Sequence, residues 1–186
     1  MFAAAPRSAA SIARKASIAE PIGSAPCNRL GGDHSRFGIE PRLVERAGFP
    51  AIYMTGFGAT ATRLGQPDIG LLTQTEMTTH ARDMVRAVGI PVIADADTGY
   101  GGPSNIERTV REYVQAGVAA IHLEDQVAPK RCGQMAGIRL MDAGENVRRL
   151  CCAVESRGDG ELLIIGRTDA LPAARIDEAV RRAKLY

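Results

Sequence analysis

From about residue 41 onward, apolar and polar positions follow two alternating patterns. Short, nearly continuous apolar runs are typical of parallel strands, because both faces of such a sheet are covered. Longer segments with apolar residues three and four positions apart predict helices. The predicted strands are 51–56, 90–99, 118–125 and 161–170, and the predicted helices are 42–49, 73–89, 105–117, 142–158 and 175–186. This alternation of strand and helix predicts an α/β fold built on a parallel sheet.

The ends of two predicted helices carry their own signals. Thr73 or Thr75 is the expected N-cap of the helix over 73–89, because a hydroxyl accepts a hydrogen bond from a free N–H of the first turn. Ser104 is the expected N-cap of the next helix. Gly117 is expected to end it, since glycine readily takes the left-handed conformation found after a last turn.

Polar side chains follow each predicted strand at its end. They are Tyr53 and Thr55, Asp95 and Asp97, Glu124, and Arg167 and Asp169. Residues two apart on a strand point to the same face, and the carboxyl ends of the strands form the catalytic rim of a (β/α)8 barrel. An open doubly wound sheet also fits the alternation. The repetition at four consecutive strands favours the TIM-barrel type, with about four to five of its βα units present.

The composition limits the kinds of molecule that the chain is expected to bind. The chain has 186 residues, 45% of them hydrophobic and 24% charged, as in globular domains. A net charge of +2 gives no support for a nucleic-acid partner. No apolar run approaches the ~20 residues of a membrane span, so no membrane association is expected. Four cysteines without a CxxC pair favour a cytoplasmic protein and argue against structural zinc.

Residues 27–41 show no clear period, and the first 26 residues differ from the rest of the chain. They are rich in Ala and Ser, and Arg7, Arg14 and Lys15 precede the first acid, Glu20. This composition is that of a disordered tail or, as the minor alternative, of a mitochondrial transit peptide. We therefore expect a divergent or disordered segment over 1–40 and a partial barrel catalytic domain over 41–186.

Three carboxylates, Asp95, Asp97 and Glu124, are expected to meet at the strand ends. Clustered carboxylates repel unless a cation lies among them. Mg²⁺ suits such hard oxygen ligands, with Mn²⁺ as a second possibility. A metal there would act as a Lewis acid on a carbonyl or an enolate, and Arg167 would neutralise a substrate carboxylate.

The segment after Glu124 brings a thiol close to this cluster. Cys132 lies beside Lys130, Arg131 and Gly133, and a thiol among cations can donate or accept a proton. The loop over 127–137 is long, polar and glycine-bearing, as a closing lid would be. His122, on the inner face of its strand, is expected to be a hydrogen-bonded core residue.

Structural roles remain as alternatives. Asp95 and Asp97 also suit a strand-end turn, Cys132 an inert thiol and Arg167 a structural ion pair. A dinucleotide fingerprint in 51–61 is not favoured, because the acid twenty residues beyond Gly56 falls inside a helix.

Four segments resemble motifs of the isocitrate lyase/phosphoenolpyruvate mutase superfamily. They are "YMTGFGATATRLGQPDIG", "DADTGYGG", "HLEDQVAPKRCG" and "GRTDA", in order between Pro41 and Tyr186. Within the superfamily, "PKRCG" resembles the carbon–carbon lyases, in particular 2-methylisocitrate lyase-like and oxaloacetate decarboxylase-like members. The resemblance implies a (β/α)8 barrel.

The resemblance also implies roles for individual residues. Asp97 would bind the metal directly, and Asp95 and Glu124 largely through water. The catalytic residues would be Cys132, which protonates the enolate product, with Arg167 and Glu124. The substrate-binding residues would be Tyr53, Thr55, Gly56, Phe57, Asp68, Lys130, Arg131, Gly133 and Arg167.

The implied activity is that of a Mg²⁺-dependent carbon–carbon lyase. Its substrate would be a 2-methylisocitrate-like or oxaloacetate-like acid, cleaved through a metal-bound enolate. The resemblance further implies a homo-oligomer, a tetramer that exchanges a C-terminal helix. Carboxyphosphonoenolpyruvate phosphonomutase-like C–P chemistry is the alternative.

The sequence departs from the family pattern in two places. Gln134 stands where the lyases usually have histidine, and "TGFG" replaces "SGGG". In addition, the family's first-strand motif is not recognisable in 25–41, and a barrel of this type needs ~250 residues. A truncated, inactive form of such an enzyme is therefore a second alternative.

Overall fold

The chain divides into two units, Met1–Gly31 and Gly32–Tyr186. The computed structural model describes residues 39–186, all within the second unit. The predicted segment 1–40 therefore lies outside the described residues, apart from its last two positions.

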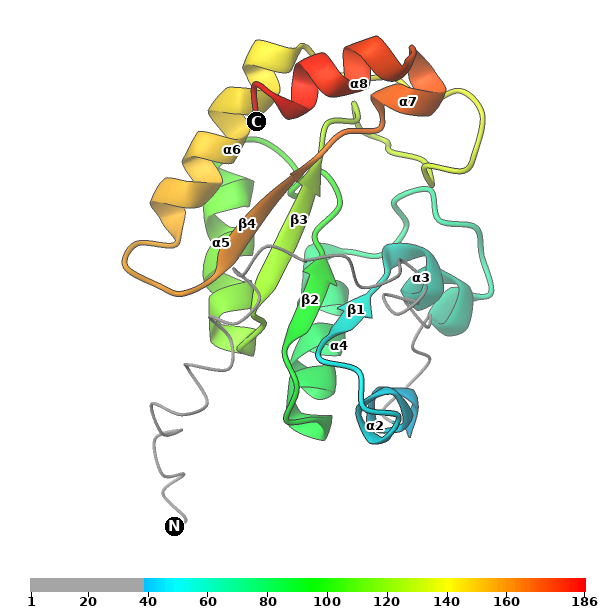
Figure 1. Cartoon of the computed structure of the whole chain (residues 1–186), viewed down its shortest axis with the longest axis vertical. Helices are drawn as coiled ribbons and strands as arrows, with labels where there is room; N and C mark the ends of the chain where they lie inside the picture. Colours follow the sequence, from blue (N-terminus) through cyan, green and yellow to red (C-terminus); the bar gives the residue numbers. More distant parts are fainter. Residues whose placement is uncertain (1–38) are drawn as a thin grey trace. The chain divides into compact units, whose positions relative to one another are not determined.

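Four strands form one parallel sheet in the order β1-β2-β3-β4 (Figure 1). The strands are β1 (Ile52–Met54), β2 (Val92–Asp95), β3 (Ala120–Glu124) and β4 (Leu163–Arg167). Each strand pairs with the next one along the chain. A parallel neighbour requires a crossover between the two strands, and helices supply it here.

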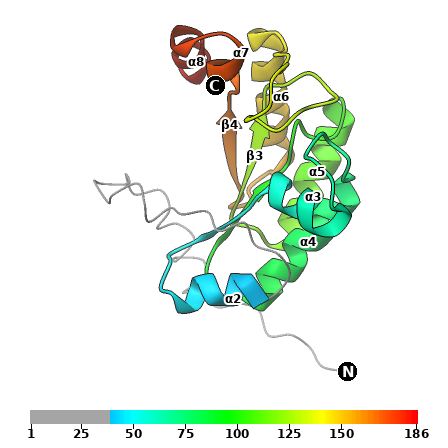
Figure 2. The ribbon, with the colours of Figure 1, turned by 90° about the vertical axis from the view of Figure 1, so that its right-hand side faces the viewer.

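The described helices connect or follow these strands. They are α2 (Ile39–Arg46), α3 (Gly56–Leu64), α4 (Gln74–Ala87), α5 (Pro103–Ala116), α6 (Ala143–Ser156), α7 (Ala170–Ala173) and α8 (Ile176–Ala183). Helices α4, α5 and α6 lie side by side over one face of the sheet (Figure 2). Helices α7 and α8 lie at the carboxyl ends of the strands (Figure 1).

The core fills the space between the sheet and these three helices. Met54, Ala94 and Ile121 project from neighbouring strands, and Met84 and Val110 from α4 and α5, all essentially inaccessible to solvent. Burying a side chain of this size contributes about 1.5–3 kcal/mol. Because strand side chains alternate between faces, residues one position away from these apolar ones point to the opposite face.

The structure confirms the predicted α/β fold with a parallel sheet, and the four strands lie within the predicted ranges. Thr73 is the N-cap of α4, as one of the two alternatives required, and Gly117 ends α5 with a left-handed φ of 81°. The Ser104 prediction was wrong. Helix α5 begins at Pro103 behind Gly102, because the fixed φ of proline suits the first helical position. Within residues 39–186, the helices are all too short or too polar to cross a bilayer.

Candidate active site

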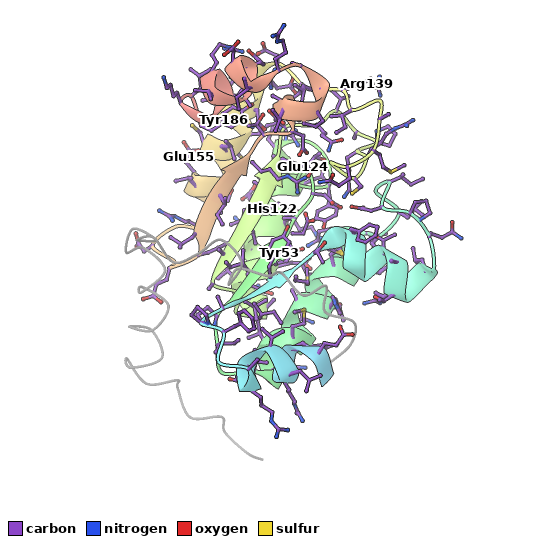
Figure 3. The ribbon with its side chains drawn as sticks, turned by 45° about the vertical axis from the view of Figure 1, so that its right-hand side comes forward. Tyr53, His122, Glu124, Arg139, Glu155 and Tyr186 are labelled. Carbon is purple, nitrogen blue, oxygen red and sulfur yellow. The ribbon has the colours of Figure 1, made fainter. Side chains whose placement is uncertain are left out.

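The strand register brings the polar side chains into two rows. Asp95 lies opposite His122 in the β2–β3 pair, and Glu124 lies opposite Arg167 in the β3–β4 pair. These residues alternate with the core residues, so they share the face that α4, α5 and α6 do not cover. Figure 3 shows Tyr53, His122 and Glu124 following one another along the sheet.

The first row is a buried chain of hydrogen bonds. His122 Nε2 lies 2.8 Å from Asp95 Oδ1, and Tyr53 Oη lies 2.8 Å from His122 Nδ1. Burial raises the pKa of Asp95, but the facing His122 and Lys130 outweigh it, so this pKa lies below its usual value. An ionised Asp95 can only accept, so His122 Nε2 donates to it. This confirms the prediction that His122 is a hydrogen-bonded core residue.

Asp97 follows β2 in a conformation that few side chains adopt. Its φ is 47°, which costs on the order of 1–3 kcal/mol for a residue other than glycine. The backbone is held there from both sides, since Asp97 N donates to Asp95 Oδ1 and Asp97 O accepts from Glu124 N. Strain retained in this way is typical of functional sites.

Lys130 is a buried ammonium between two carboxylates. Its Nζ lies 2.7 Å from Asp68 and 2.6 Å from Asp97 Oδ1, and its side chain is only 5% exposed. Burial lowers the pKa of Lys130, but Asp97, Asp95 and Glu124 raise it above its usual value, so the residue stays charged. Lys130 and Asp68, both predicted to bind substrate, are therefore packed into the base of the site.

Glu124 and Arg167 form the second row. Arg167 Nη1 lies 3.5 Å from Glu124 Oε2, and Arg167 Nη2 donates to Asp169 Oδ1 at 2.8 Å. The guanidinium keeps about a third of its surface exposed, as a group that receives a ligand should. Gly133 is close to it, since a Cβ there would stand 2.8 Å from Arg167 Nη2.

Two of the residues predicted to bind substrate, Thr55 and Gly56, lie at the start of helix α3. The sequence analysis did not predict this helix. Thr55 is its N-cap, and Gly56 donates its N–H to Asp95 Oδ2 at 2.9 Å. A Cβ on Gly56 would lie 2.8 Å from the same oxygen, so glycine is required by close approach. Phe57 follows in the first turn, 45% exposed.

The predicted lid is anchored at its start. Cys132 N donates to Asp68 O at 2.9 Å, and Val127 N donates to Arg139 O across the neck of the loop. Cys132 is half-buried, whereas Arg131 and Gln134 are exposed. The structure thus brings the thiol loop beside Arg167 but directs Arg131 to the surface, where its Nη1 bonds Ala136 O.

The carboxylates do not stand as a ready-made metal cluster. Among residues 39–186, no three His, Cys, Asp or Glu side chains are arranged to hold a metal as they stand. Asp95 is engaged with His122, and Asp97 is paired with Lys130. However, Glu124 Oε1 is a buried oxygen that accepts no hydrogen bond from residues 39–186. Asp97 Oδ1 is also buried, and its partner is the Lys130 ammonium at 2.6 Å. An unpaired carboxylate oxygen and a carboxylate already bound to a cationic group fit a metal ion.

The raised pKa values of Asp97 and Glu124 also favour a bound cation at this site. Burial and the neighbouring Asp95 raise the pKa of Asp97 to about 6, against the opposing charge of Lys130. Burial raises the pKa of Glu124 to about 9, although Lys130 lowers it. Each acid lacks enough positive charge around its ionised form, which a divalent cation would supply.

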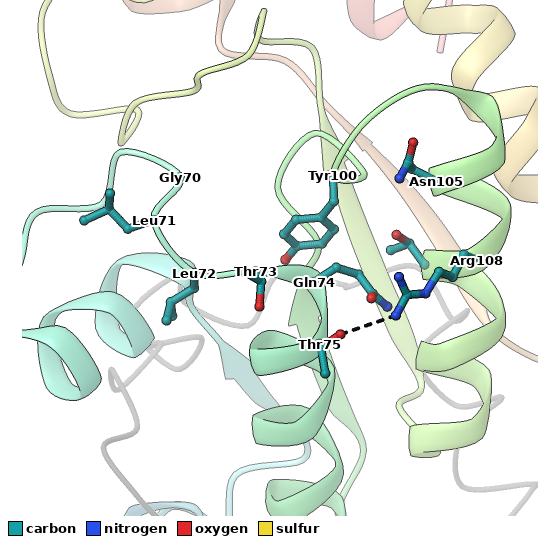
Figure 4. Close-up of a pocket in the computed structure, with 10 residues that line it drawn as sticks. Gly70, Leu71, Leu72, Thr73, Gln74, Thr75, Tyr100, Asn105 and Arg108 are labelled. Atoms are coloured by element: carbon teal, nitrogen blue, oxygen red, sulfur yellow. Dashed lines mark hydrogen bonds between the residues drawn. The ribbon is translucent and has the colours of Figure 1, made fainter.

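A separate cavity of about 400 Å³ lies between the N-terminal ends of α4 and α5 (Figure 4). It is lined by Leu72, Thr73, Gln74, Tyr100, Asn105 and Arg108, among others. None of the candidate catalytic residues lines it. The candidate site is therefore the cluster at the strand ends and not this cavity.

Comparison with known proteins gives a family match over the whole described region. The family model described as phosphoenolpyruvate phosphomutase matches residues 39–186. The 2,3-dimethylmalate lyase of Eubacterium barkeri is 52% identical over 145 residues, covering 78% of this chain and 50% of that protein. The 2-methylisocitrate lyase of Aeropyrum pernix is 46% identical over 144 residues, 77% of this chain and 46% of that protein.

Solved structures agree. A crystal structure of 2,3-dimethylmalate lyase matches with a TM-score of 0.83 at 36% identity, over 97% of this chain and 59% of that one. Oxaloacetate acetylhydrolase in complex with 3,3-difluorooxalacetate matches at 0.78 and 38%, over 82% and 52%. Phosphonopyruvate hydrolase in complex with oxalate and Mg²⁺ matches at 0.73 and 32%, over 82% and 52%. The chain spans about half the length of the curated relatives it matches.

Proposed function

The chain belongs to the phosphoenolpyruvate phosphomutase family, within the isocitrate lyase/phosphoenolpyruvate mutase superfamily, and on this premise we propose that it is a carbon–carbon lyase. Its substrate is a 2-hydroxy acid with at least two carboxylates, of the 2,3-dimethylmalate or 2-methylisocitrate type. The observation that carries the proposal is the juxtaposition of the buried carboxylates Asp97 and Glu124, the second with an unpaired oxygen, with Arg167 and the loop of Cys132.

Mg²⁺ is the proposed cofactor, supported by the Mg²⁺ complex of the phosphonopyruvate hydrolase neighbour. Asp97 and Glu124 would hold it, Glu124 through its unpaired Oε1. Asp95, whose position is fixed by the Gly56 N–H and the His122 imidazole, would support them. When bound, such an ion supplies Lewis-acid polarisation of a substrate oxygen.

The protein side chains bind and orient the substrate. Arg167 is partly exposed and permanently charged, and Asp169 holds its guanidinium in place. It can therefore bind a substrate carboxylate without first changing its side-chain conformation. Burial lowers the pKa of Arg167, but the charges of Glu124 and Asp169 raise it by more. The pKa therefore lies above its usual value, and Arg167 keeps its charge. The backbone of Thr55 and Gly56 forms the wall of the site at the end of β1.

The reaction needs no oxidant or reductant. The bond between the carbinol carbon and its neighbour breaks, and the hydroxyl gives its proton to water as its oxygen becomes the keto group of a 2-oxo acid; water later returns a proton to the Cys132 thiolate. The electron pair of the broken bond passes to the leaving carbon. Cys132 Sγ delivers a proton to that carbon, which departs as a second carboxylic acid.

C–P chemistry is a weaker candidate for this chain. Among the solved structures, phosphonopyruvate hydrolase is 32% identical and the two forms of 2,3-dimethylmalate lyase are 36% and 39% identical. A thiol that can protonate a carbanion also serves C–C cleavage better than transfer of a phosphoryl group, in which oxygens carry the charge.

A substrate screen tests the proposal. The purified chain is assayed with 2,3-dimethylmalate, 2-methylisocitrate, isocitrate, oxaloacetate and phosphonopyruvate, with Mg²⁺ or with a chelator. We expect 2-oxo acid release from a 2-hydroxy acid, lost with the chelator and in Asp97→Asn, and retained in the exposed control Asp159→Asn. Release of phosphate alone, or turnover that survives chelation, would contradict it.

A further inference from the structure

Gln126 is a buried amide that the proposed chemistry does not use. It follows Glu124 by two positions, is 1% exposed, and makes three hydrogen bonds with its side chain. Its Oε1 accepts from Arg131 N at 2.9 Å, and its Nε2 donates to Arg131 O at 2.8 Å and to Asp169 Oδ2 at 2.8 Å. All three partners belong to residues next to a candidate catalytic group.

The first two bonds hold one residue of the lid from both sides. A side-chain amide that pairs with both the N–H and the C=O of Arg131 fixes the two peptide units on either side of that residue, the second of which leads into Cys132. Cys132 is the next residue, and its own N–H is fixed by Asp68 O. The backbone that carries the thiol is therefore held at consecutive positions by two buried groups from different parts of the chain.

The third bond connects this anchor to the substrate-binding arginine. Asp169 Oδ2 accepts from Gln126, while Asp169 Oδ1 accepts from Arg167 Nε and Nη2. One amide and one carboxylate thus join Cys132 to Arg167. Only an amide fits, because the position requires an acceptor for Arg131 N and a donor for both Arg131 O and Asp169.

We propose that Gln126 is the positioning residue of this site, and that it sets the distance between the Cys132 thiol and a substrate bound by Arg167. The role in catalysis rests on the proposed lyase function. A displacement of about 1 Å of a reacting group can cost about 100-fold in rate, so loss of this anchor should act on turnover more than on substrate binding.

Two near-isosteric variants test the kinetic consequence. Gln126→Met removes all three bonds without adding charge, and Gln126→Glu keeps the acceptor but opposes Arg131 O and Asp169 with a carboxylate. We expect kcat to fall about 10- to 100-fold with KM within about threefold of wild type. In a Cys132→Ser background, Gln126→Met should change the residual rate by less than about threefold, because the thiol through which it acts is gone. The exposed control, Gln115→Met on α5, should behave as wild type.

A second readout does not depend on turnover. Site-resolved alkylation by iodoacetamide should label Cys132 at least about threefold faster in both Gln126 variants, because a released loop opens more often. Cys151, exposed on α6, serves as the internal reference and should label at an unchanged rate. If Cys132 labels at the wild-type rate in Gln126→Met, or if the kinetic effects of Gln126→Met and Cys132→Ser simply multiply, the proposal is overturned. Faster labelling in a protein that cleaves none of the acids would instead reject only the lyase function.

Discussion

At the scale of single residues, the site is organised by charges that are buried and paired. Lys130 is the centre of this arrangement, since Asp68 and Asp97 reach it from two other segments. The sequence allowed Lys130 to be named as a site residue, but not to be placed inside the protein. Its partner Asp68 lies 62 positions away, and no local pattern reports a contact of that range.

Replacing Lys130 by Met should destabilise the fold by about 3–5 kcal/mol, because two buried carboxylates lose their partner. The free energy of unfolding in urea measures this. Lys184→Met, at an exposed position on the last turn of the chain, should change it by less than about 0.5 kcal/mol. A loss from Lys130→Met as small as that of the control would mean that the ammonium contributes nothing to the site.

At the scale of elements, the strands and most helices were predictable, but α3 and α7 were not. The apolar runs of β1 to β4 stand out because both faces of a parallel strand are covered. Helix α3 was missed because "GFG" at its start is typical of a loop, and its formation depends on the contact between Gly56 and Asp95. Helix α7, over Ala170–Ala173, is too short to show a helical period.

The start of α4 offers a test at this scale. Thr73 and Glu76 form a capping box in which each side chain bonds the other residue's backbone N–H. Thr73→Ala should lower the free energy of unfolding by about 1 kcal/mol, whereas Thr79→Ala, inside the same helix, should lower it little or not at all. Equal losses would show that the cap contributes nothing specific.

The same box has a defined pH dependence. Hydrogen bonds from the Thr73 amide and hydroxyl lower the pKa of Glu76 below its usual value. An acid with a lowered pKa stabilises the fold above its unfolded pKa, and this stabilisation is lost as the pH falls through the folded value. The difference in unfolding free energy between wild type and Glu76→Gln should therefore shrink below about pH 4, as measured by urea unfolding at a series of pH values.

At the scale of the molecule, a four-stranded sheet gathers the acids of β2 and β3 at one end and leaves them short of positive charge. The polar strand ends were readable from the sequence, since they recur at each strand. The raised pKa values of Asp97 and Glu124 were not, because they depend on burial and on the distances to Asp95 and Lys130.

Mg²⁺ binding should consequently release protons and tighten as the pH rises from about 6 to about 9, since the cation displaces protons from these two acids. Without metal, an acid whose pKa is raised by folding costs stability as the pH rises from its unfolded to its folded pKa, so unfolding should become easier from about pH 4 to about pH 9. Calorimetric titration in two buffers of different ionisation enthalpy counts the released protons. Glu124→Gln should release fewer, and an affinity independent of pH would contradict the role of these carboxylates.

The most direct test of the central claim is cleavage of 2,3-dimethylmalate or 2-methylisocitrate in D₂O, followed by NMR of both products. We expect equal amounts of a 2-oxo acid and a second carboxylic acid, with a single deuterium on the carbon released from the broken bond. We also expect that Cys132→Ser slows this release by at least about 100-fold, while Mg²⁺ binding is unchanged. Wild-type rates in Cys132→Ser, or no deuterium at that carbon, would contradict the account.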